Sequence, residues 1–167
     1  VGGAIFTEVS NSQDDVQIIE NLYIGERYRS GEFGHMTLVP GGRKCYCGKI
    51  GCMDSYCSAK ALTDHTDGKL EIFFSELENN NLEIQKIWDE YLSYLAIAVN
   101  NLRMAFDCQV IVGGYVGSLI EPYIADLQER AALLNTFERN ALYIKPCNYK
   151  TEASALGAGL RLIEAYI

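Results

Sequence analysis

One histidine and three cysteines stand close together in the first third of the chain, with a spacing typical of a metal site. His35 is followed after nine residues by Cys45, Cys47 and Cys52, so one imidazole and three thiols lie within eighteen residues. In structural sites Zn²⁺ takes four tetrahedral nitrogen and sulfur ligands, and three cysteines with one histidine is a standard set. The pattern predicts one structural zinc. The alternative is a set of unlinked buried thiols.

The segment around these ligands has a distinctive sequence, GEFGH from Gly31 followed by CYCGKIGCMD from Cys45. It resembles the signature of the ROK family, the bacterial repressors and sugar kinases of the actin-like ATPase-domain superfamily, in which G-E-x-G-H precedes C-x-C-G-x-x-G-C-x-E. Every position matches except the last, where Asp54 replaces the usual Glu. Weaker counterparts are VGGAIF, CQVIVGGYVG and EASALGAGL, so the resemblance covers nearly the whole chain as the second half of a family member.

The resemblance implies an α/β fold, namely the C-terminal lobe of an actin-like ATPase (ribonuclease H-like) fold with a zinc-binding loop. We expect residues 1–167 to form a single domain, without the N-terminal lobe and without any DNA-binding domain. The chain lacks an initiator methionine and opens inside an expected strand, which we interpret as a fragment. The family's catalytic base, an aspartate, belongs to the N-terminal lobe, so no residue of this chain is expected to be catalytic.

By the same resemblance, Glu32 and His35 are expected to hydrogen-bond sugar hydroxyls, with Asp54 as a third contact. A carboxylate accepts from two hydroxyls at once, and charge-assisted bonds are strong. A histidine bound to zinc through one nitrogen keeps its other N–H for a ligand oxygen. The alternatives are that Glu32 is a solvated loop acid, that His35 is only a metal ligand, and that Asp54 favours the start of the next helix. Because Asp is shorter than Glu, the identity of the sugar also stays open.

Two glycine pairs are candidate nucleotide contacts if the protein is a kinase. Gly2 and Gly3 open the first strand, and Gly113 and Gly114 follow the strand CQVIV; family kinases have glycine-rich turns beside the nucleotide at both places. Without a Cβ, a backbone can approach a phosphate or a flat ring closely. The alternative for the first pair is a bulge or close packing. Tyr115 stands where kinases tend to have a third glycine, which we interpret as a hint towards the repressors.

The composition is that of an ordinary globular domain, with 49% hydrophobic and 22% charged residues. The net charge of −8 argues against nonspecific nucleic-acid binding by this segment, because phosphate contacts need clustered Lys and Arg. Neither a membrane-spanning run nor a secretory leader is recognisable. Because three of the six cysteines have the spacing of a metal site and the chain is not a small secreted scaffold, a reducing cytoplasm is the expected location. The cysteines outside the predicted zinc site are expected to be small buried hydrophobes, namely Cys57, Cys108 and Cys147.

Hydrophobic periodicity predicts the elements that position these residues. Strands are expected over Val1–Val9, Val16–Ile24, Cys108–Val112 and Leu142–Tyr149, with a polar turn at Asn11–Asp15, and helices are expected over Ser58–Leu62, Glu71–Leu77, Glu83–Phe106, Leu119–Leu134 and Ala153–Tyr166. The longest helix carries an apolar stripe at spacings of three and four residues. A helix, a short apolar strand, two glycines and a further helix form an α/β pattern, in which the strand CQVIV is expected to be buried.

We interpret the whole as the sugar-sensing, effector-binding domain of a ROK transcriptional repressor with a structural zinc, which reaches DNA only through an absent N-terminal domain. The alternative is the C-terminal half of an ATP-dependent sugar kinase of glucokinase or fructokinase type, with ATP and Mg²⁺ as further cofactors. A third possibility is a zinc-stabilised dimerisation lobe that has lost ligand binding. The expected partners are a sugar or sugar phosphate and a second copy of the chain, in a homodimer or higher oligomer; no membrane is expected.

Overall fold

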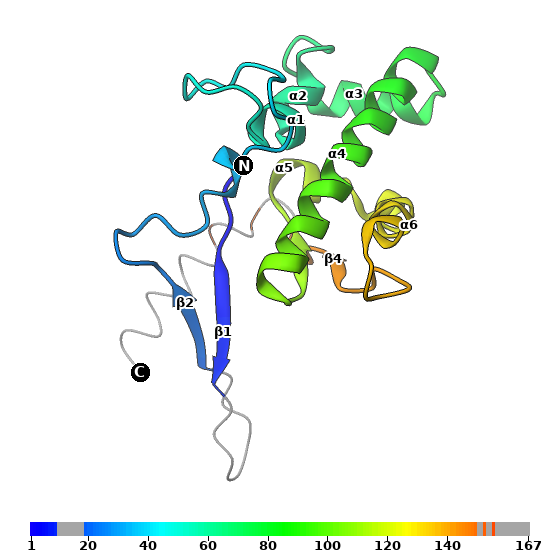
Figure 1. Ribbon diagram of the computed structural model, residues 1–167. Coiled ribbons are helices and arrows are strands. Elements are labelled where there is room, and N and C mark those ends of the chain that lie inside the picture. The colour runs from blue at the N-terminus through cyan, green and yellow to red at the C-terminus, as the bar shows by residue number, and fades with distance from the viewer. Residues whose placement is uncertain (10–18, 150–151, 153–154, 156–167) are drawn as a thin grey trace. The chain divides into compact units, whose positions relative to one another are not determined.

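The computed structural model describes residues 1–9, 19–149, 152 and 155 (Figure 1). The chain divides into two compact units, Val1–Ser55 and Tyr56–Ile167, and each is described by itself. The predicted polar turn, the first residues of the second predicted strand and the last predicted helix apart from Ala155 lie outside the described residues. The single domain over residues 1–167 stays a prediction. Within the described ranges, no helix is long and apolar enough to cross a bilayer.

The first unit begins with an antiparallel hairpin. Strand β1 (Ile5–Val9) pairs with β2 (Ile19–Tyr23), so that Ile5 lies opposite Tyr23 and Val9 opposite Ile19. The hairpin confirms the two strands predicted here. However, β1 begins at Ile5 instead of Val1, because the residues before it form other backbone contacts.

Those contacts join the start of the chain to the GEFGH motif. The N–H of Gly3 donates to the Gly31 carbonyl at 2.8 Å, and the N–H of Gly34 donates to the Val1 carbonyl at 3.0 Å. A Cβ on Gly31 would lie 2.0 Å from the Gly3 oxygen, and a Cβ on Gly3 would lie 2.5 Å from the Phe33 ring. Side chains do not fit at these two positions, so close packing alone is a sufficient reason for the glycine at position 3.

The second unit is mainly helical. Helix α1 (Asp54–Cys57) leads into it, and α2 (Ala59–Thr63), α3 (Leu70–Glu78), α4 (Leu82–Phe106), α5 (Gly114–Gly117), the 3₁₀ turn η2 (Glu121–Tyr123) and α6 (Ile124–Leu134) follow. Three of the predicted helices agree with α2, α3 and α4 to within a residue. The helix predicted from Leu119 begins later, at Ile124, because Pro122 lies in η2 instead. Helices α1 and α5 were not predicted.

Helix α4 is the longest of the described helices, and a side chain caps its start while a change of backbone conformation marks its end. The Asn81 side chain accepts hydrogen bonds from the N–H groups of Glu83 at 3.1 Å and Ile84 at 3.4 Å, which satisfies two donors that a helix start leaves free. Asp107 ends the helix in the left-handed conformation, with φ of 47°. Most of the predicted apolar stripe is buried, but Phe106 at its C-terminal end is 42% exposed. The buried residues of the helix are Ile84, Trp88, Tyr91, Leu92, Leu95, Ala96, Ala98 and Val99.

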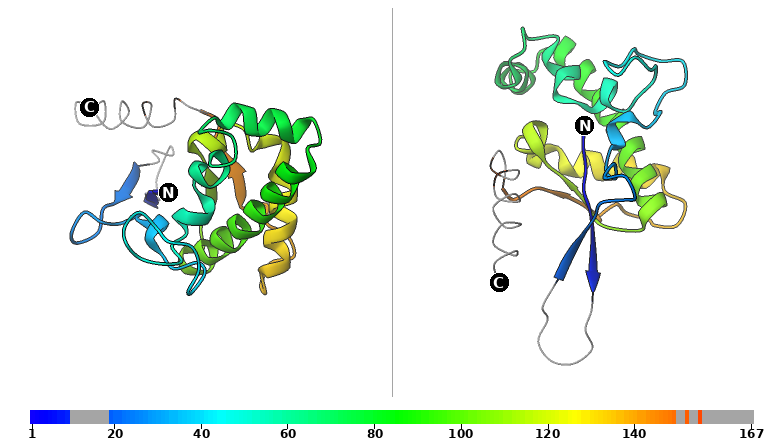
Figure 2. Two further views of the ribbon diagram at one scale, coloured as in Figure 1. Left: turned by 90° about the horizontal axis from the view of Figure 1, so that it is seen from above. Right: turned by 90° about the vertical axis from the view of Figure 1, so that its left-hand side faces the viewer.

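The core of the second unit lies between α3, α4 and α6. The Trp88 ring centroid lies 5.2 Å from that of Phe74 and 5.0 Å from that of Tyr123, and Phe73 is fully buried beside them. Helices α4 and α6 lie side by side (Figures 1 and 2), and α6 contributes the buried Leu127. Burial of these large apolar and aromatic side chains is the main stabilising contribution here.

Strands β3 (Val110–Val112) and β4 (Ile144–Pro146) pair in parallel, with Val110 opposite Ile144. Both are shorter than predicted, and the predicted burial of β3 is wrong: Ile111 is 64% exposed, whereas Ile144 is fully buried. Helix α6 explains the difference on the β4 side, because Gln128 donates to the Ile144 carbonyl at 2.9 Å. In the described part of the chain β3 pairs only with β4. The apolar side chains of β3 are therefore not covered by strands on both sides.

Candidate metal centre

A tight hairpin presents the three cysteines. The N–H of Cys45 donates to the Lys49 carbonyl at 2.8 Å, and the N–H of Gly48 donates back to the Cys45 carbonyl at 3.0 Å. Gly48 and Gly51 have φ of 88° and 83°, the left-handed region that glycine adopts without strain. A Cβ on Gly51 would also lie 1.9 Å from the Val39 oxygen. The two glycines of the C-x-C-G-x-x-G-C pattern therefore give the chain the turn that folds it around one point.

The fourth residue comes from a separate turn. His35 ends the 3₁₀ helix η1 (Phe33–His35), and Met36 after it is joined to the cysteine hairpin by a hydrogen bond from the N–H of Met53 to the Met36 carbonyl at 2.8 Å. A bridge between Thr37 and Cys52 strengthens this link. The histidine and the cysteines are thus brought together by backbone hydrogen bonds between two short segments.

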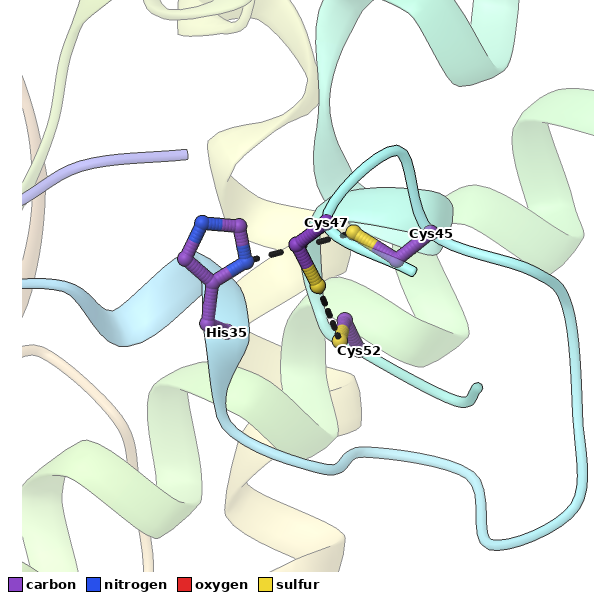
Figure 3. A group of neighbouring side chains, drawn as sticks. All are labelled: His35, Cys45, Cys47 and Cys52. Carbon is purple, nitrogen blue, oxygen red and sulfur yellow. Dashed lines mark hydrogen bonds between the residues drawn. The ribbon is translucent and has the colours of Figure 1, made fainter. Parts of the chain in front are cut away.

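The four predicted ligands meet in space (Figure 3). Nδ1 of His35 lies 3.9 Å from Sγ of Cys45, and Sγ of Cys47 lies 3.7 Å from Sγ of Cys52. All four ligand atoms lie within 4.8 Å of one another. Zn–S bonds of about 2.3 Å at tetrahedral angles place two sulfur atoms about 3.8 Å apart. We call these residues the Cys₃His cluster; its geometry fits a tetrahedral zinc.

The thiols of the cluster differ in acidity. A backbone hydrogen bond from Cys47 is the largest cause that lowers the pKa of the Cys45 thiol, to about 7, whereas burial raises the pKa of the Cys52 thiol to about 11. All three are free thiols, not disulfides. Because a metal binds the thiolate, the fully assembled site has to release these protons.

The two ring nitrogens of His35 face different groups. Nδ1 faces the cysteines, while Nε2 lies 3.3 Å from the hydroxyl of Tyr46. Partial desolvation, and then the nearby charges of Asp54, Cys45, Glu32 and Cys47, raise the pKa of the Tyr46 phenol, although its side chain is largely exposed. Tyr46 is not among the site residues predicted from the sequence. Its place between two predicted ligands, in Cys-Tyr-Cys, is the signal that was available.

The two predicted sugar carboxylates flank the Cys₃His cluster. Glu32 is exposed and directly precedes η1, without a side-chain capping bond. Asp54 is the first residue of α1, and its carboxylate accepts from the backbone nitrogen of Val1. This position agrees with the alternative that Asp54 favours the start of a helix. It does not test the predicted sugar contact. Glu32, His35 and Asp54 as sugar contacts remain predictions.

The predicted nucleotide glycines belong to different units. Gly2 and Gly3 lie in the first unit, ahead of β1. Gly113 and Gly114 lie in the second, where β3 ends and α5 begins. A Cβ on Gly114, at φ of 73°, would meet no atom of the described residues within 4 Å. The neighbouring Tyr115 is 75% exposed. Among the described residues Gly114 therefore has room beside it, whereas Gly113 lies against Cys147 and Gly3 is packed against Phe33.

Two comparisons with known proteins bear on this site. Residues 16–164 match the model of the ROK family. The chain is 29% identical over 151 residues to the N-acetylmannosamine kinases of Escherichia fergusonii and Escherichia coli K12, which covers 83% of this chain and 49% of each relative. The chain thus spans about half the length of the curated relatives that it matches.

Solved structures agree. A ROK hexokinase from Thermus thermophilus has a TM-score of 0.70 at 29% identity, over 83% of this chain and 49% of that one. A ROK family glucokinase from Streptomyces griseus, in complex with glucose and AMPPNP, has a TM-score of 0.58 at 21% identity, over 83% and 53%. These likenesses confirm the predicted fold at the level of the ROK sugar kinases, which have an actin-like ATPase fold. With a family model that matches most of its sequence, the chain belongs to the ROK family.

Proposed function

We propose that this chain is the zinc-stabilised, sugar-binding C-terminal portion of an ATP-dependent sugar kinase. The observation that carries the proposal is the Cys₃His cluster, with Nδ1 of His35 turned to the thiols and Glu32 and Asp54 flanking it. The names of the relatives, N-acetylmannosamine kinase, hexokinase and glucokinase, supply the reaction.

This proposal replaces the interpretation made from the sequence. The sequence by itself favours the sensor of a transcriptional repressor, with the kinase as the alternative. The named relatives reported above are kinases, which favours the alternative. The hint that came from Tyr115 does not outweigh them, because an exposed tyrosine beside Gly114 is compatible with either function.

The zinc would be structural. Four protein ligands complete a tetrahedral shell and leave no position for a substrate or a reactive water. The ion would stabilise the hairpin around Cys45 and Cys47. Most of this hairpin is exposed, so burial of apolar side chains contributes little to its stability. The ion also fixes the ring of His35, and with it the direction of Nε2.

The sugar would bind beside this ring. Glu32 and Asp54 accept hydrogen bonds from hydroxyls, and ionised acceptors form the stronger bonds. Their role is to orient the sugar, because holding a reactant in the reactive geometry contributes a large part of an enzyme's rate enhancement. Neither is proposed as the catalytic base that takes the proton from the sugar hydroxyl. By family resemblance, that base is an aspartate of the N-terminal lobe, which lies outside this chain.

ATP and Mg²⁺ follow from the reaction. Of the two glycine pairs, Gly113 and Gly114 are the better nucleotide candidates, because no described residue fills the space beside Gly114, whereas Gly3 is needed for packing. Gly2, where an added Cβ would meet none of the described residues within 4 Å, stays a candidate from the first pair. A homodimer or higher oligomer stays a prediction.

The test uses the full-length protein with its zinc. Sugar-dependent ATP consumption is measured over a panel that includes N-acetylmannosamine, glucose and fructose, and binding of the same sugars is measured by calorimetry. We expect ATP consumption with at least one of them. Sugar binding without any ATP consumption would overturn the kinase and restore the sensor.

A further inference from the structure

The three thiols of the Cys₃His cluster differ in exposure to solvent. Cys45 and Cys52 are buried, at 7% and 1%, whereas Cys47 is exposed. It lies at the turn of the hairpin, directly before Gly48, whose N–H closes the turn on the Cys45 carbonyl. Coordination of a metal does not require an exposed ligand. Cys47 is therefore the thiol of the cluster that a small reagent in solution reaches first.

The bound form of the cluster would also keep Cys47 reactive. A cysteine that binds zinc is deprotonated, and the thiolate is the form that reacts with electrophiles. Three exposed cations of the hairpin, Arg43, Lys44 and Lys49, favour the thiolate as well. Access and deprotonation together are the conditions under which a cysteine is oxidised selectively.

A second thiol stands ready beside Cys47. Its Sγ lies 3.7 Å from Sγ of Cys52 (Figure 3), and a disulfide requires about 2.05 Å. Four residues separate the two cysteines, and two of them, Gly48 and Gly51, have positive φ. Because Cys52 is buried, it does not meet an oxidant from solution directly. Its place suits it to react with an oxidised Cys47.

We propose that Cys47 is an oxidation site at which a hydroperoxide opens the Cys₃His cluster, with Cys52 as the resolving thiol. The thiolate of Cys47 attacks one peroxide oxygen, so that an S–O bond forms, the O–O bond breaks, and the leaving oxygen takes up a proton. The thiolate of Cys52 then attacks the sulfur of Cys47, an S–S bond forms, and hydroxide leaves and is protonated to water. The two thiolates together lose the two electrons that reduce the peroxide.

The disulfide would remove two of the four zinc ligands. His35 and Cys45, which remain, do not complete a tetrahedral shell, so the affinity for zinc falls. A dithiol reductant reverses the step by thiol–disulfide exchange. The inference rests on the structural zinc of the proposed function and adds a form of regulation to it, because the loop that carries Glu32 and His35 would keep its shape only while Cys47 is reduced.

The test uses the full-length, zinc-loaded protein and hydrogen peroxide. Elemental analysis gives the zinc content before and after treatment. Remaining thiols are then alkylated, and the unreduced protein is digested with trypsin and chymotrypsin. Cleavage after Tyr46 and Lys49 places Cys45, Cys47 and Cys52 on different fragments, so mass spectrometry identifies the two that are joined. We expect a link between Cys47 and Cys52 that forms as zinc is lost, and recovery of the zinc after dithiothreitol and added Zn²⁺.

Two histidine substitutions distinguish Cys47 from the cluster as a whole. Histidine is a zinc ligand that does not form a disulfide. Cys47→His should release zinc in peroxide more slowly than wild type, by on the order of tenfold or more. Cys45→His is the matched control, because it keeps Cys47 and Cys52 and should release zinc as fast as wild type. Cys108, a thiol outside the cluster, should stay open to alkylation throughout.

Zinc that stays bound in peroxide, or a disulfide between other cysteines, overturns the role of Cys47. So does release from Cys47→His at the wild-type rate, or equal protection by Cys45→His. If a histidine variant binds no zinc, the disulfide found in wild type decides alone. Wild type that keeps its zinc in peroxide and consumes ATP with a sugar leaves the proposed function intact without this regulation. Wild type purified without zinc overturns the structural zinc and this inference together, while ATP consumption tests the kinase separately.

Discussion

The Sγ atoms of Cys47 and Cys52 lie 3.7 Å apart. A disulfide would bring them to about 2.05 Å, and two thiolates on one tetrahedral zinc lie about 3.8 Å apart. The hairpin therefore holds this pair at the spacing of a metal site, in a loop whose turns are already closed by backbone hydrogen bonds.

The first prediction concerns Cys47→Ser. Zinc binding contributes on the order of 10 kcal/mol to a segment that it organises, so loss of one ligand should release the metal and unfold the loop between Gly31 and Ser58. Elemental analysis and the melting temperature measure both effects. Cys108→Ser is the control, since Cys108 lies outside the Cys₃His cluster. A Cys47→Ser protein that keeps its zinc and the wild-type melting temperature would show that this thiol is not a ligand.

The second prediction concerns Glu32→Gln. The substitution preserves shape and removes the charge, so a sugar that bonds to the carboxylate should bind more weakly by about 1.5–3 kcal/mol, which is roughly ten- to a hundredfold. Calorimetry on the full-length protein measures this. Glu26→Gln supplies the comparison, because Glu26 is an exposed acid in the connector before the motif. Equal affinities in the two variants would mean that Glu32 is only a solvated loop acid.

The third prediction concerns the core of the second unit. Phe73 is fully buried, whereas Ile72, one residue earlier on α3, is 43% exposed. Phe73→Ala should lower the free energy of unfolding by about 3–5 kcal/mol through lost burial and a residual cavity. Ile72→Ala should cost much less. Denaturant titration of both variants measures the difference, and similar losses would contradict the packing described here.

The fourth prediction concerns pH. Two hydrogen bonds from Arg103 to Glu138, at 3.0 and 2.8 Å, are the main cause that lowers the pKa of the Glu138 carboxyl. A carboxyl whose pKa is lower in the folded state stabilises the fold above its unfolded pKa of about 4.3 and loses this contribution as the pH falls through the folded value. Glu138→Gln should therefore destabilise the protein at pH 7 and have little effect at strongly acidic pH.

Melting curves of Glu138→Gln and wild type at neutral and acidic pH provide the test. Glu129→Gln is the control, because Glu129 is an exposed acid on α6. A difference between Glu138→Gln and wild type that persists unchanged into acid would show that charge pairing with Arg103 is not its cause.

The sequence by itself determined the four residues of the Cys₃His cluster and the family. Both depend on ligand types and glycines at short, fixed spacings. A turn that needs a positive φ, as at Gly48 and Gly51, favours glycine at that position, so it can be recognised in the local sequence. Periodicity was equally sufficient for α4, because a stripe at every third or fourth residue is a property of one helix alone.

Only the tertiary structure decided what depends on segments far apart in the chain. Contacts between separate elements determine three features. Gly3 is packed against Phe33, Ile111 stays exposed on β3 while Ile144 is buried, and the Tyr46 hydroxyl lies beside Nε2 of His35. The sequence of an apolar run or of an isolated tyrosine does not specify which residues will pack against it in the folded chain. Burial and hydrogen-bond partners belong to the folded chain, and spacing along the sequence does not specify them.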